Sequence, residues 1–312
     1  MSFLMADMGG TNIRFAVFDG KKIGTITRYK CADFPNFFDV LKAYQIKVGK
    51  LPDSFVLAVP GPSNRKEYDF VNNPWRFSLK NLKKQFGFKN IYVVNDFEAA
   101  AMSVPYLTAK DIVQVNARNV HSCTTRLITG AGTGLGVGIL VALAKDKYKA
   151  LCSEGGHISI CDITDQETRI KKFVVETYGR ASAERFISGY GLQNIYQALS
   201  GSFEKAETII QNALNQEPLS RRALLQMFAF WGDVAGDLAL VSGAYGGVYL
   251  SGGIIQTPGV LDLFNQSMFL ERFENKGRYS KLMQTIPVKI IVKKDTVFRG
   301  LKNIGLREEE KF

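Results

Sequence analysis

The chain has 312 residues, the length of two globular domains at roughly 150 residues per domain. Apolar residues make up 46% and charged residues 22% of the sequence, a composition that excludes a disordered, collagen-like or coiled-coil chain. The net charge of +11 suits nucleic acid, an anionic membrane surface or an anionic small substrate. Because the basic residues are mostly dispersed and no known nucleic-acid motif occurs, we expect a solvated basic surface and no nucleic-acid partner.

The first third of the chain predicts a mixed α/β unit. An apolar run, a polar glycine turn and a second apolar run predict a hairpin of strands over 3–6 and 13–18. Apolar periodicity then predicts helices over 37–47 and 79–86 and buried strands over 55–59 and 91–94. Asn95 and Asp96 follow the last strand, at the kind of strand end where α/β sheets collect ligands.

The remainder of the chain repeats this layout before it becomes helical. Strands are expected over 126–129 and 137–142, on either side of a glycine-rich bend at 130–136. A further strand is expected over 247–250, and helices are expected over 165–178, 181–188, 191–199, 203–215 and 220–241. Two copies of strand, glycine turn and strand suggest two related lobes that face each other across a cleft.

The sequence favours a cytoplasmic protein. Its four cysteines form no CxxC pair, and a chain of this size is not expected to need disulfides; they are Cys31, Cys123, Cys152 and Cys161. The N-terminal apolar run is too short for a signal peptide. The apolar stretch 234–255 is interrupted by Asp237 and several glycines, unlike a lipid-spanning helix, so we expect no membrane segment.

The first motif is the turn Asp7-x-Gly9-Gly10-Thr11-Asn12-x-Arg14. Bare glycines let backbone N–H groups close on phosphate oxygens, and Thr11 and Asn12 add side-chain donors. Asp7 offers the hard oxygen that Mg²⁺ prefers. An ordinary hairpin turn is the alternative, but one acid and two polar donors are more than such a turn needs.

The second motif is the bend Gly130-Ala131-Gly132-Thr133-Gly134-Leu135-Gly136. It lacks the Lys-Ser or Lys-Thr end of a Walker A loop, and a strand rather than a helix is expected to follow it, which excludes a dinucleotide fingerprint. The alternative to ligand binding is that these glycines allow close strand packing.

The remaining polar groups suit a sugar. Asp96 is a carboxylate that can accept a hydroxyl proton, although Asn95 and Asp96 are both also good helix N-caps. Glu154, His157 and Glu184 lie in or near glycine-rich segments and can pair with hydroxyls that both donate and accept. A structural histidine is the alternative for His157, and its neighbours Cys152 and Cys161 lack zinc-ligand spacing.

Taken together, these motifs resemble bacterial-type glucokinase over nearly the whole chain. The matching segments are 7–14, 95–99, 130–136, 154–157, 182–185, 188–196, 251–254, 272–278 and 286–288. The resemblance implies an α/β chain with the two-lobed, actin-like (hexokinase, ribonuclease H-like) fold, with mixed sheets and a cleft between lobes. We expect a smaller lobe over 1–106, to which the segment 294–312 returns, and a larger lobe over 107–293.

The resemblance also implies roles for single residues. Asn95, Asp96, Glu154, His157 and Glu184 would hold glucose, with Asp96 as the base toward the 6-hydroxyl. ATP would be bound by two glycine turns and a Gly-Gly element near the adenosine: Asp7 with Mg²⁺, Gly9, Gly10, Thr11, Asn12, Gly130, Gly132, Thr133, Gly134, Gly252 and Gly253. Related sugar kinases often carry a cysteine-rich zinc loop after the histidine, whereas here Cys161-Asp162-Ile163-Thr164 follows, so we expect no structural zinc.

The leading hypothesis is therefore a homodimeric kinase that phosphorylates glucose at O6 with ATP, the entry step of glycolysis. A kinase for a related hexose such as fructose, mannose or an N-acetylated hexosamine is one alternative, because specificity depends on which hydroxyls are paired. A non-catalytic sugar-sensing regulator is the other. Such a regulator is expected to lose the base, whereas Asp96 is present.

Overall fold

The computed structural model describes residues 1–70, 73–118 and 124–310. The chain divides into two compact units, of which unit 1 is Met1–Leu107 with Asp295–Phe312 and unit 2 is Thr108–Lys294. Each unit has its own sheet and its own apolar core.

Unit 1 is built on a five-stranded sheet in the order β3-β2-β1-β4-β7. These strands are β1 (Phe3–Met8), β2 (Asn12–Phe18), β3 (Thr27–Lys30), β4 (Ser54–Val59) and β7 (Asn90–Asn95). Strands β1, β4 and β7 run parallel, and β1, β2 and β3 form antiparallel pairs. A separate hairpin joins β5 (Glu67–Phe70) to β6 (Asn73–Ser78).

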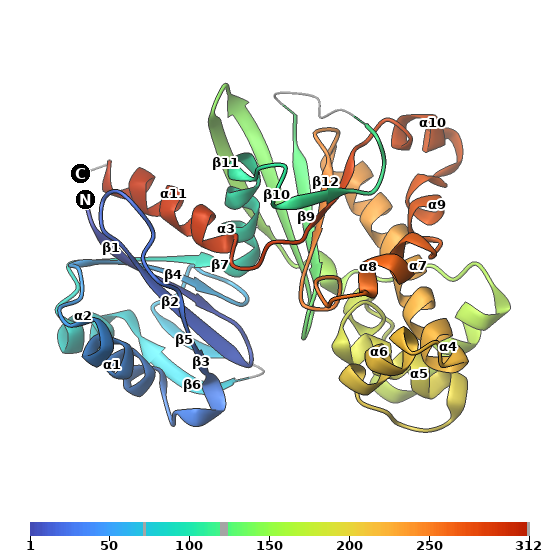
Figure 1. The fold of residues 1–312 in the computed structure, drawn as a ribbon, viewed down its shortest axis with the longest axis horizontal. Coiled ribbons are helices and arrows are strands. Elements are labelled where there is room, and N and C mark those ends of the chain that lie inside the picture. The colour runs from blue at the N-terminus through green and yellow to red at the C-terminus, as the bar shows by residue number, and fades with distance from the viewer. Residues whose placement is uncertain (71–72, 119–123, 311–312) are drawn as a thin grey trace. The chain divides into compact units, whose positions relative to one another are not determined.

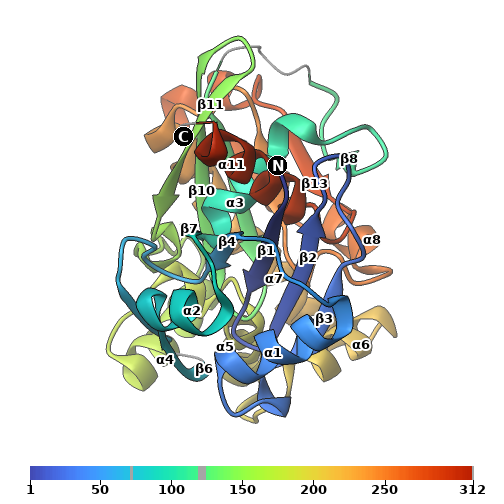
Figure 2. The same ribbon diagram turned by 90° about the vertical axis from the view of Figure 1, so that its left-hand side faces the viewer.

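Helices cover both faces of this sheet, as Figures 1 and 2 show. On one face lie α1 (Phe37–Val48) and α2 (Leu79–Phe86), and on the other lie α3 (Asp96–Ser103) and α11 (Val297–Glu309). Strand β1 is buried along its whole length, since Leu4 belongs to the core that includes α1 while the Phe3 ring faces Gly305 of α11. Short 3₁₀ turns occur at Cys31–Asp33 and Val104–Tyr106.

Unit 2 contains a six-stranded sheet in the order β11-β10-β9-β12-β13-β8. Its strands are β8 (Ile112–Gln114), β9 (Arg126–Ala131), β10 (Leu135–Ala144), β11 (Lys147–Ser153), β12 (Val248–Ser251) and β13 (Val288–Ile291). As in unit 1, an antiparallel hairpin, here β9 and β10, is extended by parallel strands, here β12 and β13.

Helices of unit 2 lie beside this sheet (Figure 1). They are α4 (Asp165–Tyr178), α5 (Gly189–Ser200), α6 (Ala206–Leu214), α7 (Pro218–Ser242), α8 (Val260–Asn265), α9 (Phe269–Glu274) and α10 (Ser280–Met283). The described part of unit 2 also has 3₁₀ turns at η3 (Gly155–His157), η4 (Ala183–Arg185) and η5 (Gly277–Tyr279).

Helix α7 is the centre of the unit 2 core. It is the one helix in the described part of the chain that is long and apolar enough to cross a bilayer, with a mean hydropathy of 1.4, but 67% of that apolar window is buried inside the protein. Phe228, Phe230 and Trp231 are almost completely buried in this core. This burial is typical of a core helix in a globular domain.

One predicted helix is wrong. The sequence pattern predicted a helix over 181–188, but the structure has only the 3₁₀ turn η4 in this stretch. Ser182 is extended and forms a bridge with Ser159, and the Ser188 hydroxyl accepts the Gly191 N–H to cap α5. Tertiary pairing at one end and a helix cap at the other therefore leave room for a single turn.

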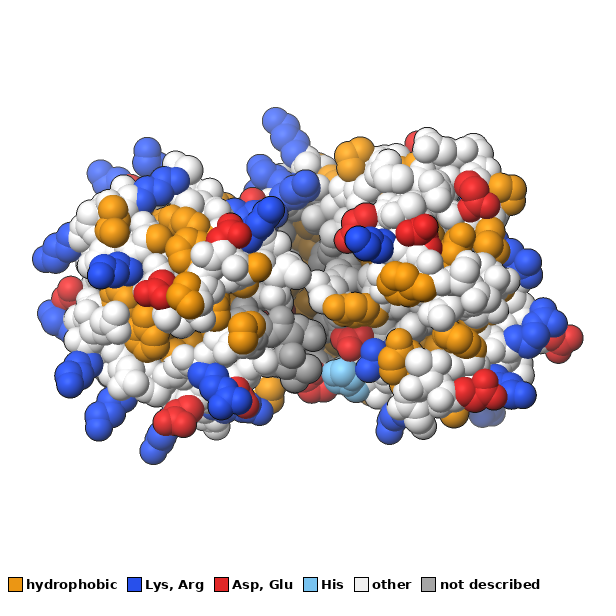
Figure 3. All heavy atoms as spheres, turned by 90° about the horizontal axis from the view of Figure 1, so that it is seen from below, with side chains coloured by type: hydrophobic (Ala, Val, Ile, Leu, Met, Phe, Trp, Pro, Cys, Tyr) orange, Lys and Arg blue, Asp and Glu red, His pale blue; other side chains and the backbone are white. Residues whose placement is uncertain are grey.

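Figure 3 draws the charged side chains on one face of the molecule. Lysine and arginine side chains are scattered over the face drawn in Figure 3 rather than gathered in one patch. Several are paired with neighbouring carboxylates, such as Lys89 with Asp53 at 2.7 Å.

Candidate active site

The first glycine turn connects β1 to β2 in unit 1. Gly9 N–H donates to the Asn12 carbonyl at 2.8 Å, and the Asn12 amide donates to the Thr11 hydroxyl at 3.0 Å. Gly9 and Gly10 are partly exposed and Thr11 is exposed. The turn thus presents backbone and side-chain donors at the surface of unit 1, as phosphate binding requires.

Asp7 lies at the end of β1 beside this turn and is only 6% exposed. Its cross-strand neighbour Arg14 forms an ion pair with it and a second ion pair with Asp295. Burial lowers the pKa of Arg14, while the hydrogen bond and charge of Asp295 oppose that shift. Mg²⁺ carried on a nucleotide needs only one or two protein carboxylates, because phosphates and waters fill its other positions, so Asp7 fits this role.

Asn95 and Asp96 have different local roles. The Asn95 side chain caps α3 by accepting the N–H groups of Phe97 at 2.8 Å and Glu98 at 3.1 Å, and its amide donates to the Gly61 carbonyl at 3.1 Å. Asp96 is the first residue of α3 and accepts the Phe97 N–H at 2.9 Å. The cap expected at this position therefore belongs to Asn95, which is buried and uses one of its two amide N–H groups on Gly61, while the Asp96 side chain is partly exposed.

The parallel strands bring these groups to one edge of the unit 1 sheet. Asp7 pairs in register with Ala58 of β4, and Ala58 pairs with Val94 of β7, one residue before Asn95. Strands β1 and β7 are two strand spacings apart, about 10 Å. The first glycine turn and Asp96 therefore lie at the same carboxyl edge, where α/β sheets bind ligands.

The second glycine turn connects β9 to β10 in unit 2. Gly132 N–H donates to the Gly134 carbonyl at 2.9 Å, and the Gly132 carbonyl accepts the Gly189 N–H at 2.8 Å. A methyl group added at Gly132 would meet nothing within 4 Å. The backbone of this turn is consequently open to a ligand, and Thr133 lies in the same turn.

Gly252 and Gly253 follow β12, which is the parallel neighbour of β9. Gly252 has a φ of +108°, and a methyl group there would lie 2.2 Å from the Ala131 carbonyl oxygen, so only glycine fits. A methyl group on Gly253 would meet nothing within 4 Å. Unit 2 thus places two glycine elements side by side, one of them beginning at Gly130.

The proposed sugar residues of unit 2 lie next to the second glycine turn. The Glu184 carboxylate accepts the Leu135 N–H at 3.1 Å, and a methyl group on Gly134 would lie 2.4 Å from it. Glu154, which directly precedes η3, and His157, its last residue, are exposed. The Ala183 N–H donates to the Ile158 carbonyl at 2.8 Å, which places η4 beside η3.

Within the described ranges, no three His, Cys, Asp or Glu side chains are close enough together to hold a metal ion. Cys152 and Cys161 are both exposed. Cys123 and the second histidine, His121, lie outside the described residues.

Sequence reasoning missed two contributors to the site. Arg14 belongs to the first motif, but its pairing with Asp7 follows from the strand register and not from the motif itself. Asp295 lies 281 residues beyond Arg14, and no local sequence signal connects the two.

Comparison with known proteins gives consistent matches. A family model described as Glucokinase matches residues 4–307. A glucokinase from Paramagnetospirillum magneticum is 36% identical over 312 aligned residues, which cover 96% of each protein. The bifunctional protein glk of Paraburkholderia xenovorans is 34% identical over 96% of this chain, but the chain spans only 48% of that relative.

Solved structures match as well. The crystal structure of a glucokinase from an Antarctic psychrotroph is 31% identical, with a TM-score of 0.82 and coverage of 96% of this chain and 97% of that one. A ROK family glucokinase from Streptomyces griseus, solved in complex with glucose and AMPPNP, is 17% identical with a TM-score of 0.64, covering 97% of this chain and 99% of that one.

Proposed function

Because the chain belongs to the glucokinase family, we propose that it transfers the γ-phosphoryl group of ATP to O6 of glucose and so forms glucose 6-phosphate. The expected actin-like fold is confirmed by the match to glucokinase structures. The observation that carries the proposal is the carboxyl edge of the unit 1 sheet, where a phosphate-type glycine turn and a partly exposed carboxylate lie together.

Asp96 is the proposed general base. A primary alcohol is a poor nucleophile at pH 7, so a carboxylate that takes the O6 proton as the bond to phosphorus forms stabilises the transition state. Asn95 fixes the start of α3 and hence the direction of Asp96, and the amide N–H that it does not use on the Gly61 carbonyl would donate to a sugar hydroxyl. The remaining sugar contacts are assigned to Glu154, His157 and Glu184, whose groups pair with hydroxyls.

The nucleotide is assigned to the glycine elements of both units. Gly9, Gly10, Thr11 and Asn12 would donate to phosphate oxygens, as would Gly132 and its neighbours. Gly252 and Gly253 are assigned to the adenosine, and the space beside Gly253 is open, since a methyl group there would meet nothing within 4 Å. Asp7 would hold Mg²⁺, which neutralises charge on the β- and γ-phosphates. In this proposal, units 1 and 2 are the two lobes of the kinase.

A hexose panel tests the proposal. The purified protein with Mg²⁺ and ATP should form ADP and glucose 6-phosphate in equal amounts, and EDTA should abolish turnover until Mg²⁺ is restored. Preferential turnover of fructose, mannose or N-acetylglucosamine would identify a kinase for a related hexose. Hexose binding without ATP consumption, together with a shift of random duplex DNA on a gel, would identify a sugar-sensing regulator.

Two further expectations accompany the proposal. Elemental analysis of the purified protein should find near-absent zinc, and one tightly bound zinc per chain would contradict this expectation. Light scattering on the protein as it elutes from a size-exclusion column should give the mass of a homodimer. A cytoplasmic enzyme of this kind acts on soluble glucose and ATP.

A further inference from the structure

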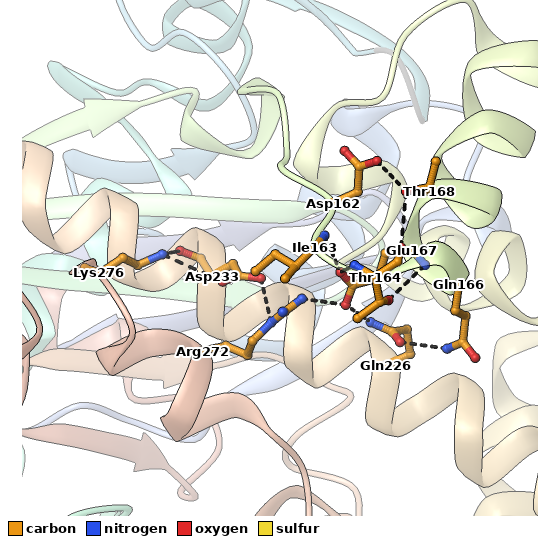
Figure 4. Close-up of polar contacts among 10 residues, drawn as sticks. All are labelled: Asp162, Ile163, Thr164, Gln166, Glu167, Thr168, Gln226, Asp233, Arg272 and Lys276. Carbon is orange, nitrogen blue, oxygen red and sulfur yellow. Dashed lines mark hydrogen bonds and ion pairs between the residues drawn. The ribbon is translucent and has the colours of Figure 1, made fainter.

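A buried network of charged side chains joins three helices of unit 2 (Figure 4). Arg272 on α9 lies 2.5 Å from the Glu167 carboxylate on α4 and 2.9 Å from the Asp233 carboxylate on α7. Arg272, Glu167 and Asp233 are 5%, 2% and 8% exposed. Lys276 extends the network to Asp233 and to Asp237 at 2.7 Å. Arg272 and Lys276 belong to the segment 272–278, which the resemblance singled out and the proposed function does not use.

The backbone that carries Arg272 is tightly packed against the core. Helices α7 and α9 pack closely, because a methyl group on Gly232 would lie 2.2 Å from the Phe269 carbonyl and one on Gly236 would lie 2.7 Å from the Phe273 carbonyl. The Lys276 ammonium also donates to the Asp233 carbonyl at 2.9 Å. The position of the Arg272 side chain is therefore set by two helices of the core.

Glu167 connects these two packed helices, α7 and α9, to the loop before α4. One carboxylate oxygen accepts the Ile163 N–H at 2.8 Å and the Thr164 N–H at 3.2 Å, and the Thr164 hydroxyl accepts the Glu167 N–H in return. The other oxygen receives Arg272 and the Gln226 amide. Burial raises the pKa of Glu167, but the hydrogen bonds from Arg272, Ile163 and Gln226 outweigh burial and lower the pKa below its ordinary value.

The loop that Glu167 holds is short and leads directly to the sugar residues. Residues 158–163 separate His157 from Thr164. At the His157 end, the Ile158 carbonyl and Ser159 pair with Ala183 and Ser182, at the start of the 3₁₀ turn that carries Glu184. Ile160 is buried between the two ends.

We propose that Arg272 is a positioning residue for the sugar site, which through Glu167 fixes the loop 158–164 and thereby the placement of His157 and Glu184. The inference rests on the proposed function, since it assigns these two side chains to glucose. Arg272 itself touches no substrate. Without it, Glu167 keeps its bonds to the loop and to Gln226 of α7 but loses its charged link to α9, so the loop gains freedom.

Two variants test the proposal. Glu167→Gln keeps an acceptor for the loop N–H groups but loses the charge that pairs with Arg272, and Arg272→Met keeps the apolar stem. Calorimetry without nucleotide should show glucose affinity falling about tenfold in each, the loss expected when one buried polar contact is weakened. Affinity for ADP should change less than about twofold, because the network reaches the second glycine turn only indirectly, through the loop and the Glu184 carboxylate that accepts the Leu135 N–H. Arg272→Lys should restore part of the glucose affinity.

Hydrogen exchange supplies a readout that is independent of sugar. Amides of 158–164 should exchange faster in both variants, while those of α2 in unit 1 should not change. Arg118→Met is the matched control: it breaks a 2.6 Å ion pair to Glu274, which also lies on α9, but it touches nothing in the loop, so glucose affinity and loop exchange should stay at the wild-type level.

The outcomes separate this inference from the proposed function. Wild-type protein that binds glucose, with unchanged glucose affinity in folded Glu167→Gln, would overturn the positioning role alone, whatever the exchange rates. Equal losses of glucose and ADP affinity would overturn it too, because they indicate a general structural effect. Wild-type protein that binds no hexose would overturn the proposed function, and the inference with it. Should Arg272→Met fail to fold, Glu167→Gln decides the question.

Discussion

Arg14 on β2 pairs with Asp295, 281 residues further along the chain, just before α11 begins. The same guanidinium pairs with Asp7, so one side chain connects the end of β1 to the start of the C-terminal helix. Asp295 has a φ of +62°, a left-handed conformation that Asp and Asn tolerate better than most residues.

Arg14→Met should destabilise the protein by roughly 1–3 kcal/mol, because it leaves the buried Asp7 carboxylate without its charged partner. Arg28→Met is the control. Arg28 lies at the longer distance of 3.4 Å from Asp295 and its side chain is 52% exposed, so removing this ion pair should cost less than about 1 kcal/mol of stability. Urea unfolding measures the free energy of unfolding of both variants. Equal stability losses in the two variants would show that the buried ion pairs of Arg14 stabilise the protein no more than the exposed ion pair of Arg28.

Asp96→Asn should lower kcat by roughly 10²–10⁴-fold, because an amide cannot take the O6 proton. The variant should remain folded and bind ATP, since the α3 cap is made by Asn95. Asn95→Ala is the complementary variant and should lose about 1 kcal/mol of stability with the cap. Thermal melting and steady-state kinetics separate the two effects. A folded Asp96→Asn protein with more than about a tenth of wild-type kcat would rule out the base assignment.

Gly134→Ala should weaken glucose binding by about tenfold, because the new methyl group displaces the Glu184 carboxylate that holds the Leu135 N–H. Gly132→Ala is the matched variant two residues away. Its methyl group meets nothing within 4 Å, so the fold and glucose affinity should be retained, and any change should appear in the KM for ATP. Identical profiles for the two variants would argue against separate sugar and nucleotide roles in this turn.

Glu98→Gln should raise the Tm at pH 7. Burial raises the pKa of Glu98, the negative charge of Glu308 adds to the rise, and a backbone hydrogen bond from Asn95 partly opposes it. Ionised Glu98 therefore costs stability, and this cost disappears as pH falls through the raised pKa and the carboxyl takes up a proton. The difference in Tm should shrink toward about pH 4. Glu67→Gln, at an exposed position of β5, is the control, and a pH-independent difference for Glu98→Gln would contradict the explanation.

Helices with explicit end signals were predicted well. The bounds expected for α2 and α4 match the structure, since Ser78 and Thr164 cap their first turns and Gly87 and Gly179 end them in the left-handed conformation. The hairpin strands β1 and β2 were also confirmed, although each extends further into the glycine turn than the apolar pattern indicated. Local chemistry was sufficient for these elements.

Interactions between distant segments could not be read from the sequence. The short strands β3, β8 and β13 form because of their partners in the sheet and have weak patterns of their own. The same limit applied to η4, where bridging to Ser159 replaced the predicted helix. The candidate site residues came from motifs and from a family resemblance, whereas Asp295 and the Glu167 network needed the fold.

The discontinuity of unit 1 has a consequence for synthesis of the chain. Helix α11 packs against α3, β1 and β4, with Gly300 close to the Ala99 carbonyl and Gly305 against the Phe3 ring. All of unit 2 precedes α11 in the sequence. At roughly 5–20 residues per second, the ribosome needs about 10–40 s to make unit 2, and during that time the face of the unit 1 sheet that α11 covers stays uncovered. Unit 2 can therefore complete its core first, and a ribosome that stalls before α11 leaves a nascent chain with an exposed apolar sheet face for chaperones to bind.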